Sequence, residues 1–124
     1  MNDEDPVKKP FDLRVRTKRF ALRIITLYRS LPKDIEAQII GRQVLRSGTS
    51  VGAQYREGHR ARSTAEFISK LESASQELDE TMYWFELLVE SGIVSEAKLA
   101  ELQDEADQLM AIFVTSIKRP KSKR

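Results

Sequence analysis

Apolar side chains recur at alternating intervals of four and three residues in the second half of the chain. The series is Phe67, Leu71, Ala74, Leu78, Thr81, Phe85 and Leu88. This spacing places every member on one face of an α-helix and is typical of helices that pack into bundles. It therefore predicts a long helix over residues 64–91. Ser63 and Glu66 would form a capping box at its start, and Gly92 would end it.

Three other stretches show the same kind of periodicity and predict helices over 12–30, 32–60 and 95–118. The apolar contacts expected from the second of these come from Ile35, Ile39, Ile40, Val44, Val51 and Tyr55. Pro32 suits the first position of that helix. The short connections make each helix antiparallel to the one before it. The sequence therefore predicts an all-α protein, an antiparallel up-down-up-down four-helix bundle over residues 12–118, with a flexible segment at 1–11 and a basic tail at 119–124.

Two glycines interrupt the helix expected at 32–60, in the run Ser47-Gly48-Thr49-Ser50-Val51-Gly52-Ala53. A glycine inside a helix costs about 1 kcal/mol relative to alanine. Close approach of another helix would offset that cost, since the missing side chain leaves room for it. The alternative is a break at the glycines that divides the helix in two.

Length and composition limit the remaining possibilities. A chain of 124 residues is the size of one domain, and the lack of cysteine excludes disulfides and thiolate metal sites. No apolar run approaches the roughly 18 residues of a membrane span. The acidic start, Met1-Asn2-Asp3-Glu4-Asp5, lacks the pattern of a signal peptide. We therefore expect a cytoplasmic protein without a membrane partner.

The sequence contains no recognisable active site. Its single histidine, His59, stands two residues after Glu57, which is the wrong spacing for the Glu-x-x-His pairs of di-iron bundles. No phosphate-binding glycine loop or zinc-protease motif is present. We therefore expect no enzymatic activity, no metal and no cofactor.

Charge is strongly segregated along the chain. Residues 8–62 contain 14 Lys and Arg against 4 Asp and Glu, whereas residues 63–117 contain 2 against 12. Arginines that recur on one side of a helix can bind the phosphates of RNA or DNA. A stripe of arginines, Arg42, Arg46, Arg56 and Arg60, returns to one side of the second helix, and Thr49 and Ala53 lie between them as a small-residue gap. The first helix adds a second basic group beside its apolar stripe, Arg16, Arg19 and Arg23. The predicted nucleic-acid-binding residues are Arg16, Arg19, Arg23, Arg42, Arg46, Arg56 and Arg60.

A second interpretation uses the same charges differently. Glu77 and Glu80 of the third helix could pair with the arginines, within one subunit or across an interface. Tyr83, Trp84 and Leu87 point away from the apolar series, and such residues often contact another surface. These five residues are the predicted oligomer interface. The alternative for Trp84 is that it covers the gap between two helices of its own bundle.

Two segments resemble the four-helix bundle proteins encoded in bacterial 23S ribosomal RNA intervening sequences. They are the run Leu45-Arg46-Ser47-Gly48-Thr49-Ser50-Val51-Gly52-Ala53-Gln54-Tyr55-Arg56-Glu57-Gly58, and the run from Ser63 to Leu71 with its continuation from Ser73 to Thr81. The family usually has Asn where this chain has Gln54.

The resemblance implies an up-down bundle that assembles into a ring, a pentamer. It also implies an architecture similar to the accessory variability protein of diversity-generating retroelements, which binds nucleic acid and a reverse transcriptase. A reverse transcriptase is thus a partner by analogy. The family assigns no catalytic role, but Arg46 falls on a signature position. We hypothesise a buried pair of Arg46 with a carboxylate that holds the helices in register.

Two functions follow. The first is a non-enzymatic oligomeric protein that binds nucleic acid as an accessory or scaffold, and the alternative is a self-assembling interaction module with no nucleic-acid role. The position of the arginines discriminates between them. Arginines that form ion pairs with Glu77, Glu80 and neighbouring acids would favour the interaction module. Arginines that face solvent together would favour nucleic-acid binding.

Overall fold

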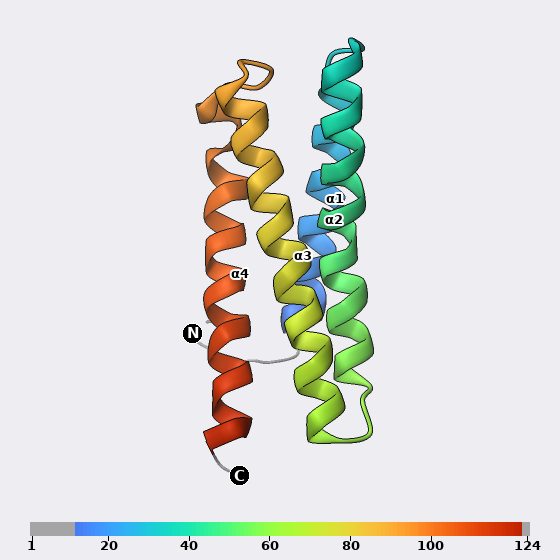
Figure 1. Ribbon diagram of the computed structural model, residues 1–124, viewed down its shortest axis with the longest axis vertical. Coiled ribbons are helices and arrows are strands. Elements are labelled where there is room, and N and C mark those ends of the chain that lie inside the picture. The colour runs from blue at the N-terminus through green and yellow to red at the C-terminus, as the bar shows by residue number, and fades with distance from the viewer. Residues whose placement is uncertain (1–11, 123–124) are drawn as a thin grey trace.

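Four helices lie side by side along one long axis in the computed structural model, which describes residues 12–122 (Figure 1). They are α1 (Asp12–Ser30), α2 (Ile35–His59), α3 (Thr64–Glu90) and α4 (Glu96–Ser122). Consecutive helices run in opposite directions in this view. Residues 12–122 contain no strand, so the all-α prediction is confirmed. The segment predicted to be flexible, 1–11, lies outside the described residues, as do residues 123–124 of the predicted tail.

The polar signals at the helix starts operate largely as predicted. The Ser63 side chain accepts a hydrogen bond from the Glu66 amide at 3.1 Å, as an N-cap should. The Glu66 carboxylate accepts from the Arg62 amide rather than from that of Ser63. Gly92 adopts a φ of +81°, which only glycine reaches without strain, and it follows the end of α3.

Two helix boundaries differ from the prediction by more than one residue. α2 begins at Ile35 instead of residue 32, with Asp34 in the extended conformation as its N-cap. Pro32 therefore belongs to the connection, where its fixed φ is equally compatible with a turn. α4 continues to Ser122, past the predicted end at 118. Basic side chains such as Lys118 are favourable at a helix C-terminus because of the helix dipole.

The four apolar stripes close into one core. Phe20, Phe85 and Phe113 are its largest fully buried side chains, and the α3 series predicted from the sequence is buried except for Phe67, which is partly buried against the core. The core extends from Leu13 near the start of α1 to Phe113 in α4. All four helices thus contribute to a single interior, as the periodicity predicts.

The prediction for the start of α2 is wrong at two positions. Ile35 and Ile39 are 75% and 55% exposed rather than buried. The buried face of α2 contains mostly small side chains, among them Ala37, Gly41 and Gly48. Large apolar side chains therefore identify the wrong face at the start of α2. The face that packs here consists of small residues, which let the neighbouring helix approach closely.

α2 is continuous through its glycines, which excludes the alternative of a break. A Cβ atom at Gly41 would lie 2.6 Å from Leu31, and one at Gly48 would lie 2.8 Å from Ile24. Both neighbours belong to α1 or its end. The glycines thus allow α1 to pack closely against α2, which is the role that the sequence predicts for them.

We expect Gly48→Ala to lower the free energy of unfolding by about 1 kcal/mol. The new methyl group would displace Ile24, and overpacking costs about 1–3 kcal/mol. The gain in helix propensity, about 1 kcal/mol, only partly offsets this cost. Urea denaturation of Gly48→Ala, Ile24→Ala and the double variant completes a mutant cycle. Strictly additive effects, or a stabilised single variant, would contradict the close contact.

Candidate nucleic-acid interface

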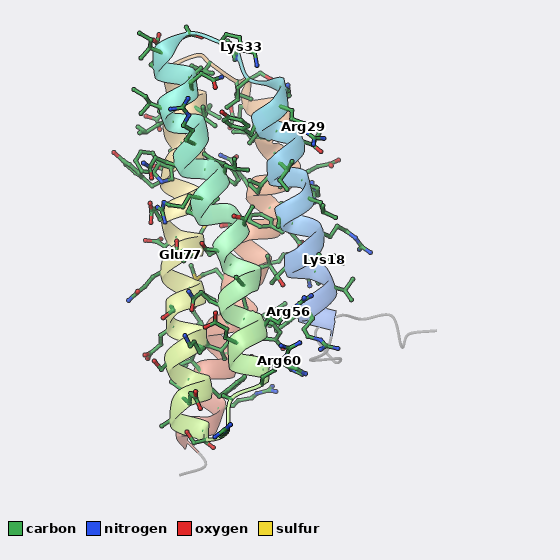
Figure 2. The ribbon with its side chains drawn as sticks, turned by 90° about the vertical axis from the view of Figure 1, so that its right-hand side faces the viewer. Lys18, Arg29, Lys33, Arg56, Arg60 and Glu77 are labelled. Carbon is green, nitrogen blue, oxygen red and sulfur yellow. The ribbon has the colours of Figure 1, made fainter. Side chains whose placement is uncertain are left out.

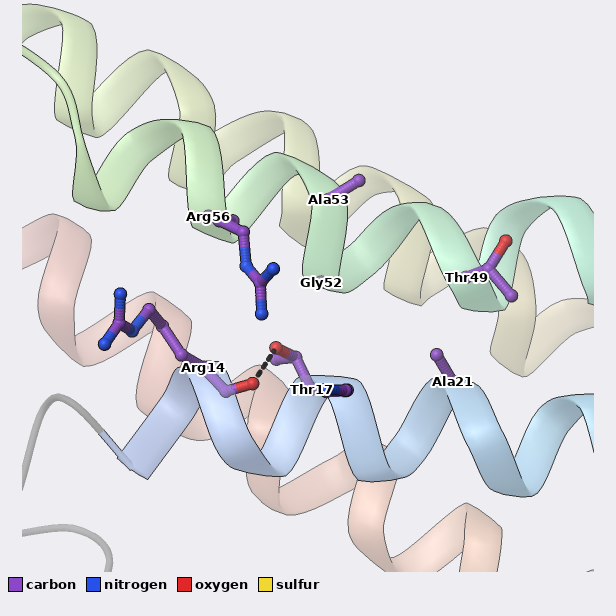
Figure 3. A pocket seen from close by; sticks show the side chains of 8 residues that line it. Arg14, Thr17, Ala21, Thr49, Gly52, Ala53 and Arg56 are labelled. Carbon is purple, nitrogen blue, oxygen red and sulfur yellow. Dashed lines mark hydrogen bonds between the residues drawn. The ribbon is translucent and has the colours of Figure 1, made fainter.

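A cleft of about 310 Å³ opens between α1 and α2, and we call it the basic cleft (Figure 3). It is lined by Arg14, Thr17, Lys18 and Ala21 of α1 and by Thr49, Gly52, Ala53 and Arg56 of α2. Its lining combines three cationic side chains with a floor of small residues. The sequence prediction of a small-residue gap beside the arginines of the second helix corresponds to its α2 wall.

The floor of the basic cleft is built by close helix contact. A Cβ atom at Gly52 would lie 3.1 Å from the Thr17 hydroxyl oxygen, so a larger residue would push the helices apart. The Thr17 hydroxyl donates to the Leu13 carbonyl at 2.7 Å, and the Thr49 hydroxyl donates to the Leu45 carbonyl at 2.7 Å. Both threonines thus direct their protons to their own helices.

The walls of the basic cleft are positively charged. The Arg56 side chain reaches from α2 toward α1, and Arg14 lies on the opposite wall (Figure 3). Arg14, Lys18 and Arg56 form no ion pair with any residue of the described range 12–122. Burial raises the pKa of the nearby Tyr55 hydroxyl, and the positive charge of Arg14 partly counteracts this increase.

Three other predicted arginines, Arg19, Arg42 and Arg60, are exposed. Within the described part of the chain they too form no ion pair. Figure 2 shows Arg56 and Arg60 one turn apart near the C-terminal end of α2. The structure therefore brings Arg56 and Arg60 into the neighbourhood of the α1 cations, whereas Arg42 lies farther back along α2.

Arg16 has a different environment from the one predicted for it. Its guanidinium donates to both carboxylate oxygens of Glu105 in α4, at 3.0 and 2.7 Å, and to the Gln108 side chain at 3.2 Å. Its side chain is only 11% exposed. A partly buried guanidinium that is already paired with a carboxylate offers little to a phosphate, so Arg16 is a packing residue between α1 and α4.

Arg46 and Arg23 also face acids. Arg46 pairs with Glu77 at 3.4 Å and with Glu80, and its side chain is 50% exposed. The hypothesised Arg46–carboxylate pair therefore exists but is half-exposed, not buried. Arg23 approaches the well-exposed Glu101 at 3.5 Å. The positions of the arginines were expected to discriminate between the two functions. They divide the arginines into a group that pairs with acids and a group that faces solvent.

Some of the side chains predicted to form an oligomer interface on α3 are instead half-buried within their own subunit. Trp84 is half-buried against the core, and its indole N–H donates to Glu80 at 3.1 Å. This arrangement favours the alternative that Trp84 covers a gap in its own bundle. Leu87 is half-buried, and Tyr83 is 52% exposed with its ring edge against Trp84. Of the three, Tyr83 offers the largest apolar surface to a neighbour.

Arg14 and Lys18 were missed by sequence reasoning, which selected the α1 arginines beside the apolar stripe. A signal does exist, because Arg14, Lys18 and Ala21 recur at intervals of four and three and so share one helix face. Only the register of α1 against α2, fixed by contacts such as Thr17 with Gly52, shows that this face meets Arg56.

Other kinds of site find little support in residues 12–122. Nowhere in this range do three or more His, Asp or Glu side chains gather in a way that could hold a metal ion. In the same range, no helix has a stretch that is both long and apolar enough to span a bilayer.

Comparison with known proteins identifies relatives of unknown function. Residues 11–115 match the 23S rRNA-intervening sequence protein family. The fold is similar to the crystal structure of a protein of unknown function from the S23 ribosomal protein family of Bacteroides thetaiotaomicron VPI-5482. The two chains are 34% identical with a TM-score of 0.81, and the match covers 86% of this chain and 98% of the other. No curated protein sequence matches the chain.

Proposed function

The chain belongs to the 23S rRNA-intervening sequence protein family, and from this premise we propose that it is a non-enzymatic, oligomeric accessory protein that binds RNA or DNA through the surface around the basic cleft. Binding depends on phosphate contacts and carries little sequence specificity, because phosphates are alike in every sequence.

One observation carries the proposal: the cations between α1 and α2 have no acidic partner in the described residues. The ion pairs of Arg16 and Arg46 each join the basic half of the chain to the acidic half, since α1 meets α4 and α2 meets α3. At the α1–α2 contact both helices are basic, so Arg14, Lys18 and Arg56 line the same cleft. A polyanion supplies the charge that the bundle itself does not supply there.

The test is filter binding of labelled single- and double-stranded RNA and DNA across a salt series. We expect affinity to fall steeply with salt, and Lys18→Glu/Arg56→Glu to weaken binding about 30-fold with a shallower salt dependence. Each phosphate contact that is lost removes about 0.7–0.9 from the slope of log K against log salt.

Lys33→Glu combined with Arg29→Glu is the matched control. It makes the same change in charge at the other end of α1 and in the connection to α2 (Figure 2). Equal weakening by both double variants would show that only net charge matters and would contradict a role for this surface. No binding of any of the four nucleic acids at low salt, with the folded protein in hand, would overturn the proposed function.

Self-assembly without nucleic-acid binding is the second candidate. The pairing of Arg46 with Glu77 and Glu80 favours it, because these charges then serve the bundle. Ile35, Ile39 and Tyr83 add exposed apolar surface of the kind that subunit contacts bury. We propose a pentamer, and light scattering should then give five times the 14.2 kDa of one chain. An assembled protein that binds no nucleic acid would favour this second candidate. A monomer would contradict the oligomer that both candidate functions include.

A further inference from the structure

The basic cleft has the dimensions of a small-ligand site rather than of a flat charged surface. Its volume of about 310 Å³ is at the lower end of the range of roughly 300–1,000 Å³ that is typical of ligand pockets. Side chains of modest length at Ala21 and Ala53 would fill it. The absence of such side chains leaves an opening between the helices into which a group from outside can enter.

The chemistry of the lining selects an anion. The Thr17 and Thr49 hydroxyl protons are already directed to the backbone carbonyls of Leu13 and Leu45. The donors that remain are the cationic groups of Arg14, Lys18 and Arg56. Three like charges around one opening repel each other, and an anion placed among them converts this repulsion into attraction. A planar guanidinium also matches two phosphate oxygens at once.

The lining does not suit a nucleobase. None of the eight residues around the basic cleft is aromatic, so the cleft has no platform on which a base could stack. Small apolar groups of the lining, such as Ala21 and Ala53, instead suit the carbon face of a sugar. The cleft therefore favours the backbone of a strand over its bases.

We propose that the basic cleft is a binding site for one sugar–phosphate unit, with the phosphate held by Arg14, Lys18 and Arg56 and the sugar against the small-residue floor. That the unit belongs to an RNA or DNA strand depends on the proposed function. A free sugar phosphate has the same chemistry, and the experiment below separates the two sources.

The direct test is titration of the isotope-labelled protein with ribose 5-phosphate, followed by amide NMR. We expect saturable shifts at Ala21, Gly52 and Ala53. Inorganic phosphate should bind at least threefold more weakly, because it lacks the sugar, and ribose alone should cause no saturable shift. Ala53→Leu fills the cleft without changing charge and should weaken binding at least tenfold. Leucine is a good helix former, so the fold should tolerate it.

Matched variants separate the cleft from general charge effects. Arg56→Ala should weaken ribose 5-phosphate binding at least tenfold, and Arg56→Lys should recover part of the loss. Arg29→Ala, which removes the same charge at the far end of α1, should change it less than twofold. Ala100→Leu, at an exposed alanine of α4, should leave it unaltered. Equal effects of Arg56→Ala and Arg29→Ala, or full binding by Ala53→Leu, would overturn the proposal.

Binding of RNA by the same variants separates this proposal from the proposed function. If RNA binds but ribose 5-phosphate causes no shift in the cleft, the cleft proposal fails and the proposed function stands. If ribose 5-phosphate occupies the cleft but no nucleic acid binds, the proposed function fails and the cleft is a site for a free sugar phosphate. If Ala53→Leu weakens both, the strand is the source of the unit.

Discussion

Phe113→Ala is expected to lower the free energy of unfolding by about 3–5 kcal/mol, because it removes a fully buried aromatic ring from the core. The ring lies 6.1 Å from that of Tyr55, with an interplanar angle of 21°, and so connects α4 to α2 across the core. Urea denaturation followed by circular dichroism measures the loss. Protein concentration must be held fixed, since the proposed assembly would make the apparent stability depend on it.

The adjacent Val114 is the control for this prediction. It is 39% exposed, and Val114→Ala should change the free energy of unfolding by less than about 0.5 kcal/mol. A loss below about 1 kcal/mol for Phe113→Ala would contradict a single dry interior. The two neighbouring substitutions together thus test whether α4 presents the face that its periodicity predicts.

The α3 series was predictable because its seam consists of large apolar residues at helical spacing. Leu71, Leu78 and Phe85 are each fully buried, as the pattern requires. The same reasoning assigned the wrong buried face to the first turns of α2, because Ile35 and Ile39 are in fact exposed. Periodicity identifies a core face when size and burial coincide. It is less informative where close helix approach selects small residues such as Ala37.

The candidate site was only half predictable, because it depends on contacts between helices. Arg56 and the small residues Thr49 and Ala53 are on one helix, and their spacing alone places them together. The partners of Arg56 in the basic cleft, Arg14 and Lys18, depend on the α1–α2 register. Arg16 illustrates the same limit, since its acid, Glu105, is 89 residues away along the chain. Spacing within one helix cannot show which acid faces which arginine.

Charge segregation acquires a physical meaning once the helices are placed. The acidic helices α3 and α4 each lie against a basic helix and neutralise part of it, through pairs such as Arg46 with Glu80 and Arg16 with Glu105. The contact between the two basic helices receives no such compensation within residues 12–122. The chain thus pairs one part of its positive charge with its own acids and leaves another part without an ion pair in the described residues.

Arg16→Ala is expected to lower the free energy of unfolding by about 3 kcal/mol, because it leaves the Glu105 carboxylate, 19% exposed, without its partner. Arg16→Met/Glu105→Leu should recover most of the loss, since two apolar side chains need no compensation. Arg46→Met is the matched comparison, and its half-exposed pairs should contribute only about 0–1 kcal/mol. Urea denaturation at low and high salt measures both losses. Salt screens the half-exposed pairs of Arg46 much more than the partly buried pair of Arg16. A similar, salt-sensitive loss in both variants would show that Arg16 is an ordinary surface charge and would return it to the group available for phosphate.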